Sequence, residues 1–143
     1  MDDTRGAEGN LLSFGTDDEG NAQAVVALYP GRFLHTAGYG WIAWTGTHWE
    51  ACDAESKLDR AIIDTLQQRR SAVMAVFKEE RVRTTRRAAT VVKGCKYLLK
   101  SILRVSVDDF DNDPDLPNCA NGVLDLRSGQ LTPHDPNQRF TYV

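Results

Sequence analysis

The stretch NCANGVLDLRSGQLTPHD at residues 118–135 predicts a compact β-hairpin and decides the fold of this part of the chain. Asn121 and Gly122 form a strong turn signal, because both residue types tolerate positive φ. Residues 123–126 alternate apolar and polar side chains, as half-buried strands do. The connection RSG ends on the residue type best suited to a left-handed backbone, and the proline after residues 130–132 blocks extension of the return strand.

An aromatic hairpin and two long helices are predicted upstream of this stretch. Residues 41–50 carry three tryptophans around Gly46 and predict a hairpin. A first long helix is expected over residues 54–80, with room for a break or bend at residues 70–71, where the apolar spacing skips a turn. A second is expected over residues 86–103, where apolar side chains fall on one arc of about 120°. Antiparallel packing of these helices would bury both apolar stripes.

The expected fold class is therefore α+β and predominantly helical. It combines two long packed helices with an N-terminal aromatic β-hairpin and a C-terminal β-hairpin. A short helix through residues 22–28 and a short strand at residues 33–35 are expected to precede the aromatic hairpin. Residues 1–15 are polar and glycine-containing, so we expect disorder there apart from three apolar side chains.

Composition excludes several classes of protein. A chain of 143 residues supports one domain with a core. No run approaches the roughly 18 apolar residues of a membrane helix, and the acidic N-terminus is unlike a secretory signal. The 3 cysteines and 3 histidines are scattered, which speaks against a disulfide framework or a zinc site. A reducing cytoplasm is the expected location.

The net charge of −3 conceals a strong asymmetry along the chain. Residues 57–104 contain 13 basic and 4 acidic residues, a net charge of +9, whereas the remainder carries −12. Such a basic block indicates nucleic acid or an acidic partner. The alternative is that the acidic flanks neutralise the block within the fold.

Basic side chains gather on the polar arc of the second predicted helix. Their spacing could follow a phosphate backbone, and such binding would depend strongly on salt. The alternative is an ordinary solvated helix face. The candidate nucleic-acid-binding residues are Arg83, Arg86, Lys93, Lys96, Lys100 and Arg104.

Two other groups of residues each allow two interpretations. The tryptophans at residues 41–50 could stack on unpaired bases, but a small sheet more commonly uses such rings as its core. Asp109 and Asp111 could form a metal pair of a polymerase-type primase, although an acidic connector is the simpler interpretation. No phosphate-binding loop or hydrolase motif occurs, so we expect no catalytic residue, no metal and no cofactor in this chain.

The C-terminal hairpin resembles a known family. Its pattern is similar to the segment that precedes the ATPase core in phage and plasmid primase–helicases, the superfamily 3 helicases of the satellite-phage and poxvirus type. The aromatic hairpin, the two long helices and the acidic stretch at residues 105–116 follow the order of that family, with one departure at Pro117. The residues that carry the resemblance, in a structural role, are Trp41, Trp44, Gly46, Trp49, Asn121, Gly122, Asp125, Leu126, Gly129 and Pro133.

The resemblance implies an N-terminal accessory domain over residues 16–135 that acts in DNA replication. Residues 136–143 would begin the connection to a helicase core of the same polypeptide, to which ATP and Mg would belong. The expected partners are DNA, that core and further copies of the chain, with no membrane. One alternative is a protein–protein interaction module without nucleic-acid contact. Another is a primase fragment that uses the two aspartates.

Overall fold

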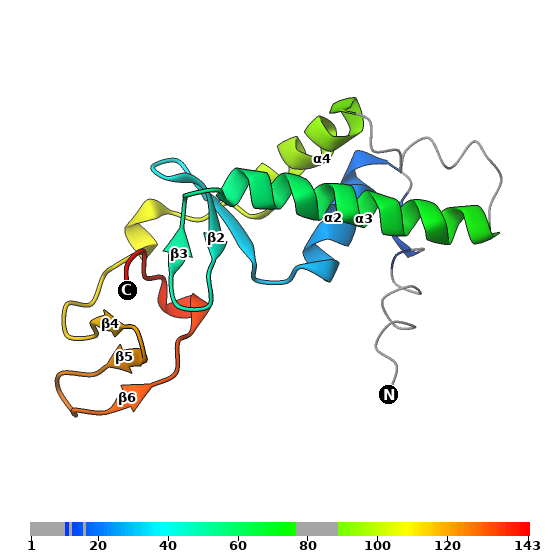
Figure 1. Ribbon diagram of the computed structural model, residues 1–143. Coiled ribbons are helices and arrows are strands. Elements are labelled where there is room, and N and C mark those ends of the chain that lie inside the picture. The colour runs from blue at the N-terminus through cyan, green and yellow to red at the C-terminus, as the bar shows by residue number, and fades with distance from the viewer. Residues whose placement is uncertain (1–10, 12, 16, 77–88) are drawn as a thin grey trace. The chain divides into compact units, whose positions relative to one another are not determined.

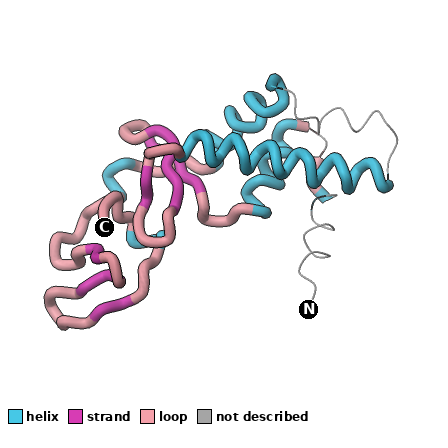
Figure 2. Tube along the Cα trace, viewed as in Figure 1, coloured by secondary structure: helices cyan, strands magenta, loops and turns pink. Residues whose placement is uncertain are grey.

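The computed structural model describes residues 11, 13–15, 17–76 and 89–143, which form helices and small antiparallel sheets (Figures 1 and 2). This mixture confirms the predicted α+β class. The chain divides into two compact units. Unit 1 comprises residues 1–30 and 56–102, and unit 2 comprises residues 31–55 and 103–143.

Helix α2 (Asp18–Leu28) belongs to unit 1 and begins directly after Asp17, with two acidic residues in its first turn. The side chain of Asp17 accepts a hydrogen bond of 2.8 Å from the backbone nitrogen of Gly20. This N-cap satisfies one of the free donors of the first turn, and acidic residues there complement the helix dipole. The helix ends at Leu28, with Tyr29 as its C-cap, directly before Pro30 and Gly31.

Helix α3 (Ala54–Val76) runs without interruption through residues 70–71, so it has no break there. The apolar spacing skips a turn after Leu66 because Arg69 occupies the inward position. Its side chain is only 1 % exposed. The buried guanidinium donates to Asn21 Oδ1 at 2.6 Å and to the backbone oxygen of Gly15 at 2.6 Å. The predicted end of this helix, residues 77–80, lies outside the described residues.

Helix α4 (Ala89–Ile102) packs most closely against the short helix α2. Gly94 lies at this contact, where a Cβ would lie 2.3 Å from Oδ2 of the exposed Asp18 side chain. A salt bridge of 3.0 Å between Lys96 Nζ and Asp59 Oδ1 links α4 to α3. The two predicted long helices, α3 and α4, are thus joined partly through the short helix α2.

Unit 2 contains a first antiparallel sheet of strands β1 (Phe33–Thr36), β2 (Gly40–Trp44) and β3 (Trp49–Glu50), in that order. The last two form the predicted aromatic hairpin, in which Trp44 pairs with Trp49. The core of this unit is a cluster of apolar side chains from the sheet and the segment that follows α4. Its members are Ile42, Trp49 and Phe110, with Leu34, Trp44 and Val105 packed against them.

The second sheet of unit 2 contains strands β4 (Asn118–Cys119), β5 (Gly122–Leu124) and β6 (Leu131–Thr132). Strands β5 and β6 are the predicted hairpin, and β4 adds a strand that the sequence did not predict. The 3₁₀ helices η3 (Val107–Asp109) and η4 (Pro136–Gln138) flank this sheet along the chain.

The turn between β4 and β5 is shifted by one residue from the prediction. Cys119 pairs with Gly122, so the two turn residues are Ala120 and Asn121. Gly122 lies in the strand with φ 144°, and a Cβ there would approach the backbone oxygen of Thr132 to 2.4 Å. Glycine is therefore required for close contact between strands as well as for its backbone angle.

Candidate nucleic-acid interface

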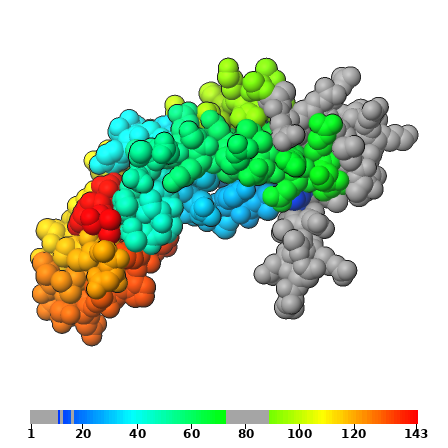
Figure 3. Space-filling model, viewed as in Figure 1, coloured from blue at the N-terminus to red at the C-terminus, as the bar shows by residue number. Residues whose placement is uncertain are grey.

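The candidate basic residues are only partly brought together. Lys93 and Lys100 are exposed on α4, and neither makes an ion pair with a described residue. Lys96 is half-buried and paired with Asp59. The outer surface of unit 1 includes the side chains of α4 (Figure 3). This helix therefore presents two exposed lysines as candidates for an interface, and a third lysine is paired with α3.

Three of the six candidates lie outside the described range of this helix. Arg104 lies beyond the end of α4 and belongs to unit 2, where it forms an isolated bridge with His35. Arg83 and Arg86 lie outside the described residues. Arg104 is therefore assigned to a different unit from the lysines with which the sequence analysis grouped it.

Sequence reasoning missed Tyr97, which lies on α4 between the two exposed lysines. Its side chain is 77 % exposed, more than any other large hydrophobic residue of the described chain. The helical periodicity that placed the lysines on the polar arc also places Tyr97 there. Its position on the polar arc was the signal in the sequence that could have identified it.

The tryptophans of the aromatic hairpin lie in or beside the core of unit 2. Trp49 is 3 % exposed, and its Nε1 donates a hydrogen bond of 2.9 Å to the backbone oxygen of Pro136. Trp44 packs against Trp49 with 5.6 Å between ring centroids, and Trp41 meets His35 edge to face at 5.0 Å. These contacts favour core packing over base stacking.

The motif residues of the C-terminal hairpin shape its turns. Asp125 accepts a hydrogen bond of 2.8 Å from the backbone nitrogen of Arg127. This bond is the main cause that lowers the pKa of the Asp125 carboxyl. Gly129 has φ 72°, as a turn of this kind requires. The remaining motif residues Gly46, Asn121, Leu126 and Pro133 lie in turns or at strand ends and are exposed.

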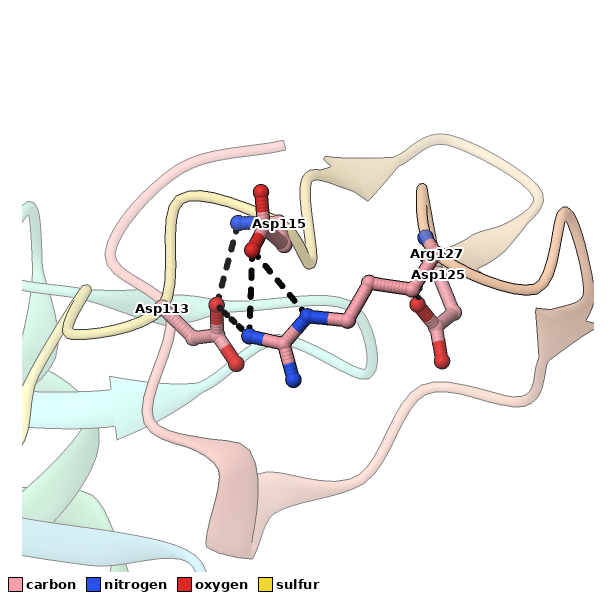
Figure 4. Close-up of polar contacts among 4 residues, drawn as sticks. All are labelled: Asp113, Asp115, Asp125 and Arg127. Atoms are coloured by element: carbon pink, nitrogen blue, oxygen red, sulfur yellow. Dashed lines mark hydrogen bonds and ion pairs between the residues drawn. The ribbon is translucent and has the colours of Figure 1, made fainter.

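Arg127, which the sequence did not single out, binds the acidic stretch before the hairpin (Figure 4). Its Nη2 lies 3.0 Å from Asp115 Oδ2 and 3.5 Å from Asp113 Oδ1, and its Nε donates to Asp115 at 3.1 Å. The side-chain hydrogen bond to Asp115 is the main cause that raises the pKa of Arg127. Part of the acidic stretch is therefore neutralised within unit 2.

The two aspartates considered as a metal pair differ in their surroundings. Both carboxylate oxygens of Asp111 accept hydrogen bonds from Thr141, one from its backbone nitrogen and one from its hydroxyl. Asp109 lies in η3 and is exposed. Within the described ranges, no three potential metal-ligating side chains come together.

Asn118 is a third residue that sequence reasoning missed. Its side chain is buried, and its Nδ2 donates to the backbone oxygens of Thr47 and Tyr142, both at 2.7 Å. It thereby joins the aromatic hairpin to the last residues of unit 2. Together with the hydrogen bond from Trp49 Nε1 to the backbone oxygen of Pro136, it connects the aromatic hairpin to the C-terminal segment of unit 2.

Comparison with known proteins gives one family. Residues 22–143 match the family model described as "D5 N terminal like". No curated protein matches the chain. Within the part that the structure describes, no helix is long and apolar enough to cross a membrane.

The family match covers both units and most of the chain. It supports the resemblance for the accessory region and points to DNA replication. The chain therefore belongs to the D5 N-terminal-like family, the N-terminal domains of D5-like primase–helicases of phages and poxviruses.

Proposed function

We propose that this chain is a non-catalytic accessory domain of a phage or prophage primase–helicase and positions DNA through the exposed face of α4. The observation that carries the proposal is the pair of exposed lysines, Lys93 and Lys100, on a helix of a replication-family domain. Both are free of ion pairs with described residues, whereas Lys96 is bound by Asp59. An uncompensated pair of cations suits phosphate contact.

The distribution of charge supports the same face. Unit 1 carries 13 basic and 10 acidic residues, a net charge of +3, and unit 2 carries 4 basic and 10 acidic residues, a net charge of −6. The positive unit is thus the one that contains α4. Phosphate contacts fix the position of DNA without reading its bases, as a domain that delivers any sequence to a helicase requires.

Two phosphate contacts give weak binding in isolation. We propose that the affinity becomes useful when several copies act together beside a helicase core of the same polypeptide. ATP, Mg and strand separation would belong to that core, of superfamily 3 type. The domain would act in the cytoplasm.

The test is fluorescence anisotropy with labelled single-stranded and duplex DNA over a series of salt concentrations. The variant Lys93→Glu/Lys100→Glu should lose affinity. For single strands, its log–log salt slope should be smaller by about 1.4, because each phosphate contact contributes about 0.7. The control Lys57→Glu/Arg60→Glu makes the same charge change on exposed positions of α3 and should keep most of the affinity. Equal affinity and slope for the wild type and the α4 variant would refute the proposal.

A protein–protein interaction module is the alternative. In it, the basic face of one copy would bind the acidic stretch of another. Asp113 and Asp115 are already paired with Arg127, so Asp108 and Asp109 would have to supply that surface. Light scattering that detects oligomers at low salt and monomers at high salt, without any DNA binding, would favour this alternative.

The primase alternative needs Asp109 and Asp111 as metal ligands. The bonds from Thr141 already occupy both carboxylate oxygens of Asp111. Metal-dependent incorporation of nucleotides, abolished by Asp109→Asn, would nevertheless establish it.

A further inference from the structure

Tyr97 is unusual among the aromatic side chains of the described chain. The other two exposed tyrosines contact aromatic rings, Tyr39 that of Phe110 and Tyr142 that of Phe140. Tyr97 is 77 % exposed and has no ring contact with a described residue. An exposed ring on a regular helix presents an open face to a ligand. The loss of conformational entropy on binding is small, because the backbone that carries the ring is already ordered.

The two exposed lysines flank this ring. Lys93 precedes Tyr97 by four residues and Lys100 follows it by three, so all three side chains lie within about 60° of one another around the helix. Along the axis the lysines are roughly 10 Å apart, with the ring between them. The buried positions Cys95 and Leu99 lie on the opposite side of the helix.

An aromatic ring between two ammonium groups suits single-stranded nucleic acid. An unpaired base can stack on the ring, while the lysines contact phosphates on either side. In a duplex the bases are stacked on one another and are not available to the ring. We infer that Tyr97 stacks on an unpaired base and makes the α4 face selective for single-stranded DNA. This inference rests on the proposed phosphate contacts and adds to them the DNA form that is bound.

The test compares Tyr97→Ala, Tyr97→Phe and wild type for binding to fluorescein-labelled oligo(dT) and to a duplex of equal length. Tyr97→Ala should weaken binding to the single strand between about 5-fold and 150-fold, the range of one stacked base. It should leave duplex affinity and both salt slopes unchanged, because no charge is removed. Tyr97→Phe keeps the ring and should bind as the wild type does.

Two further measurements make the test specific. Ile102→Ala truncates another exposed side chain of α4 and should not change affinity for the single strand. Photo-crosslinking to an oligonucleotide that contains iodouracil should attach to the peptide with Tyr97. Alanine is the better helix former at this exposed position, so far-ultraviolet circular dichroism should show unchanged helix content.

The outcomes separate the inference from the proposed function. If Tyr97→Ala binds oligo(dT) as the wild type does while Lys93→Glu/Lys100→Glu does not, stacking is wrong and phosphate contact stands. Equal losses for the single strand and the duplex would overturn the selectivity. Absence of wild-type binding to either DNA at low salt would overturn both ideas, and an acidic protein partner would then be the better explanation of this face.

Discussion

Replacing Gly20 by alanine tests how the N-terminal segment is held in unit 1. Gly20 lies in the first turn of α2, where helix propensity alone would favour alanine over glycine by up to about 1 kcal/mol. However, a Cβ at this position would lie 1.8 Å from the backbone oxygen of Gly15. That oxygen belongs to the main chain and accepts a hydrogen bond of 2.6 Å from Arg69 Nη2.

The alanine can be accommodated only if Gly15 moves away from Arg69. A hydrogen bond to a charged group contributes about 1.5–3 kcal/mol, and the guanidinium that loses it is buried. Burial already lowers the pKa of Arg69, which reflects the unfavourable surroundings of its charge. After subtraction of the propensity gain, Gly20→Ala should reduce the free energy of unfolding by about 0.5–2 kcal/mol.

Urea denaturation with two probes measures this change. Circular dichroism at the helix band reports mainly on unit 1, which holds most of the helix, whereas tryptophan fluorescence reports on unit 2, which contains Trp41, Trp44 and Trp49. The Gly20→Ala midpoint should fall in the circular dichroism signal.

The matched control is Gly94→Ala, in the interior of α4. Its Cβ would meet only the tip of the exposed Asp18 side chain, which can rotate away. This variant should gain up to about 1 kcal/mol. If Gly20→Ala is stabilised to the same extent as Gly94→Ala, then the contact between Gly15 and Arg69 does not hold the segment and the reasoning is refuted.

Two further predictions concern a thiol and an amide. Burial raises the pKa of Cys95 to about 12, so iodoacetamide should alkylate the exposed Cys52 in the native protein and leave Cys95 unmodified until urea is added. The pKa of this thiol is higher in the folded protein than in the unfolded one. The protonated thiol therefore stabilises the folded protein fully below about pH 9, and this stabilisation is lost as the pH rises towards about 12. Cys95→Ser should lack that part of the alkaline decline in urea titrations, and an identical decline in both proteins would contradict the assignment. Asn118→Ala should lower the free energy of unfolding by about 2 kcal/mol, because the backbone oxygens of Thr47 and Tyr142 lose their donor. An unchanged urea midpoint, measured by tryptophan fluorescence, would contradict this prediction.

The sequence predicted those elements whose pattern is local. Helix α4 followed from an apolar stripe at regular spacing, and strands β5 and β6 followed from alternation between turn residues. The continuity of α3 could not be predicted in this way, because a buried arginine occupies an inward position at which the pattern requires an apolar residue. Strand β4 has two residues and no alternation, so only its partner across the turn makes it a strand.

For the candidate site, too, the sequence predicted the features that depend on local pattern and not the contacts between distant residues. The exposed lysines of α4 followed from helical periodicity, but the pairing of Lys96 with Asp59 joins residues on different helices. The pairing of Arg127 with Asp113 and Asp115 likewise depends on how the chain folds back on itself. Such contacts have no period in the sequence, so they could not be predicted from a single chain.

Helices α3 and α4 lie in the sequence between the two segments of unit 2. During synthesis on a ribosome, strands β1, β2 and β3 emerge early, but the partners of Trp49 and of the Thr47 backbone oxygen emerge only with the last segment. The helices depend more on local contacts and can form while this loop is still open, whereas the sheet unit must wait for a contact of high sequence separation. A nascent chain would therefore expose its tryptophan-rich hairpin until synthesis passes residue 136, and this interval is when a chaperone would bind it and when aggregation would begin.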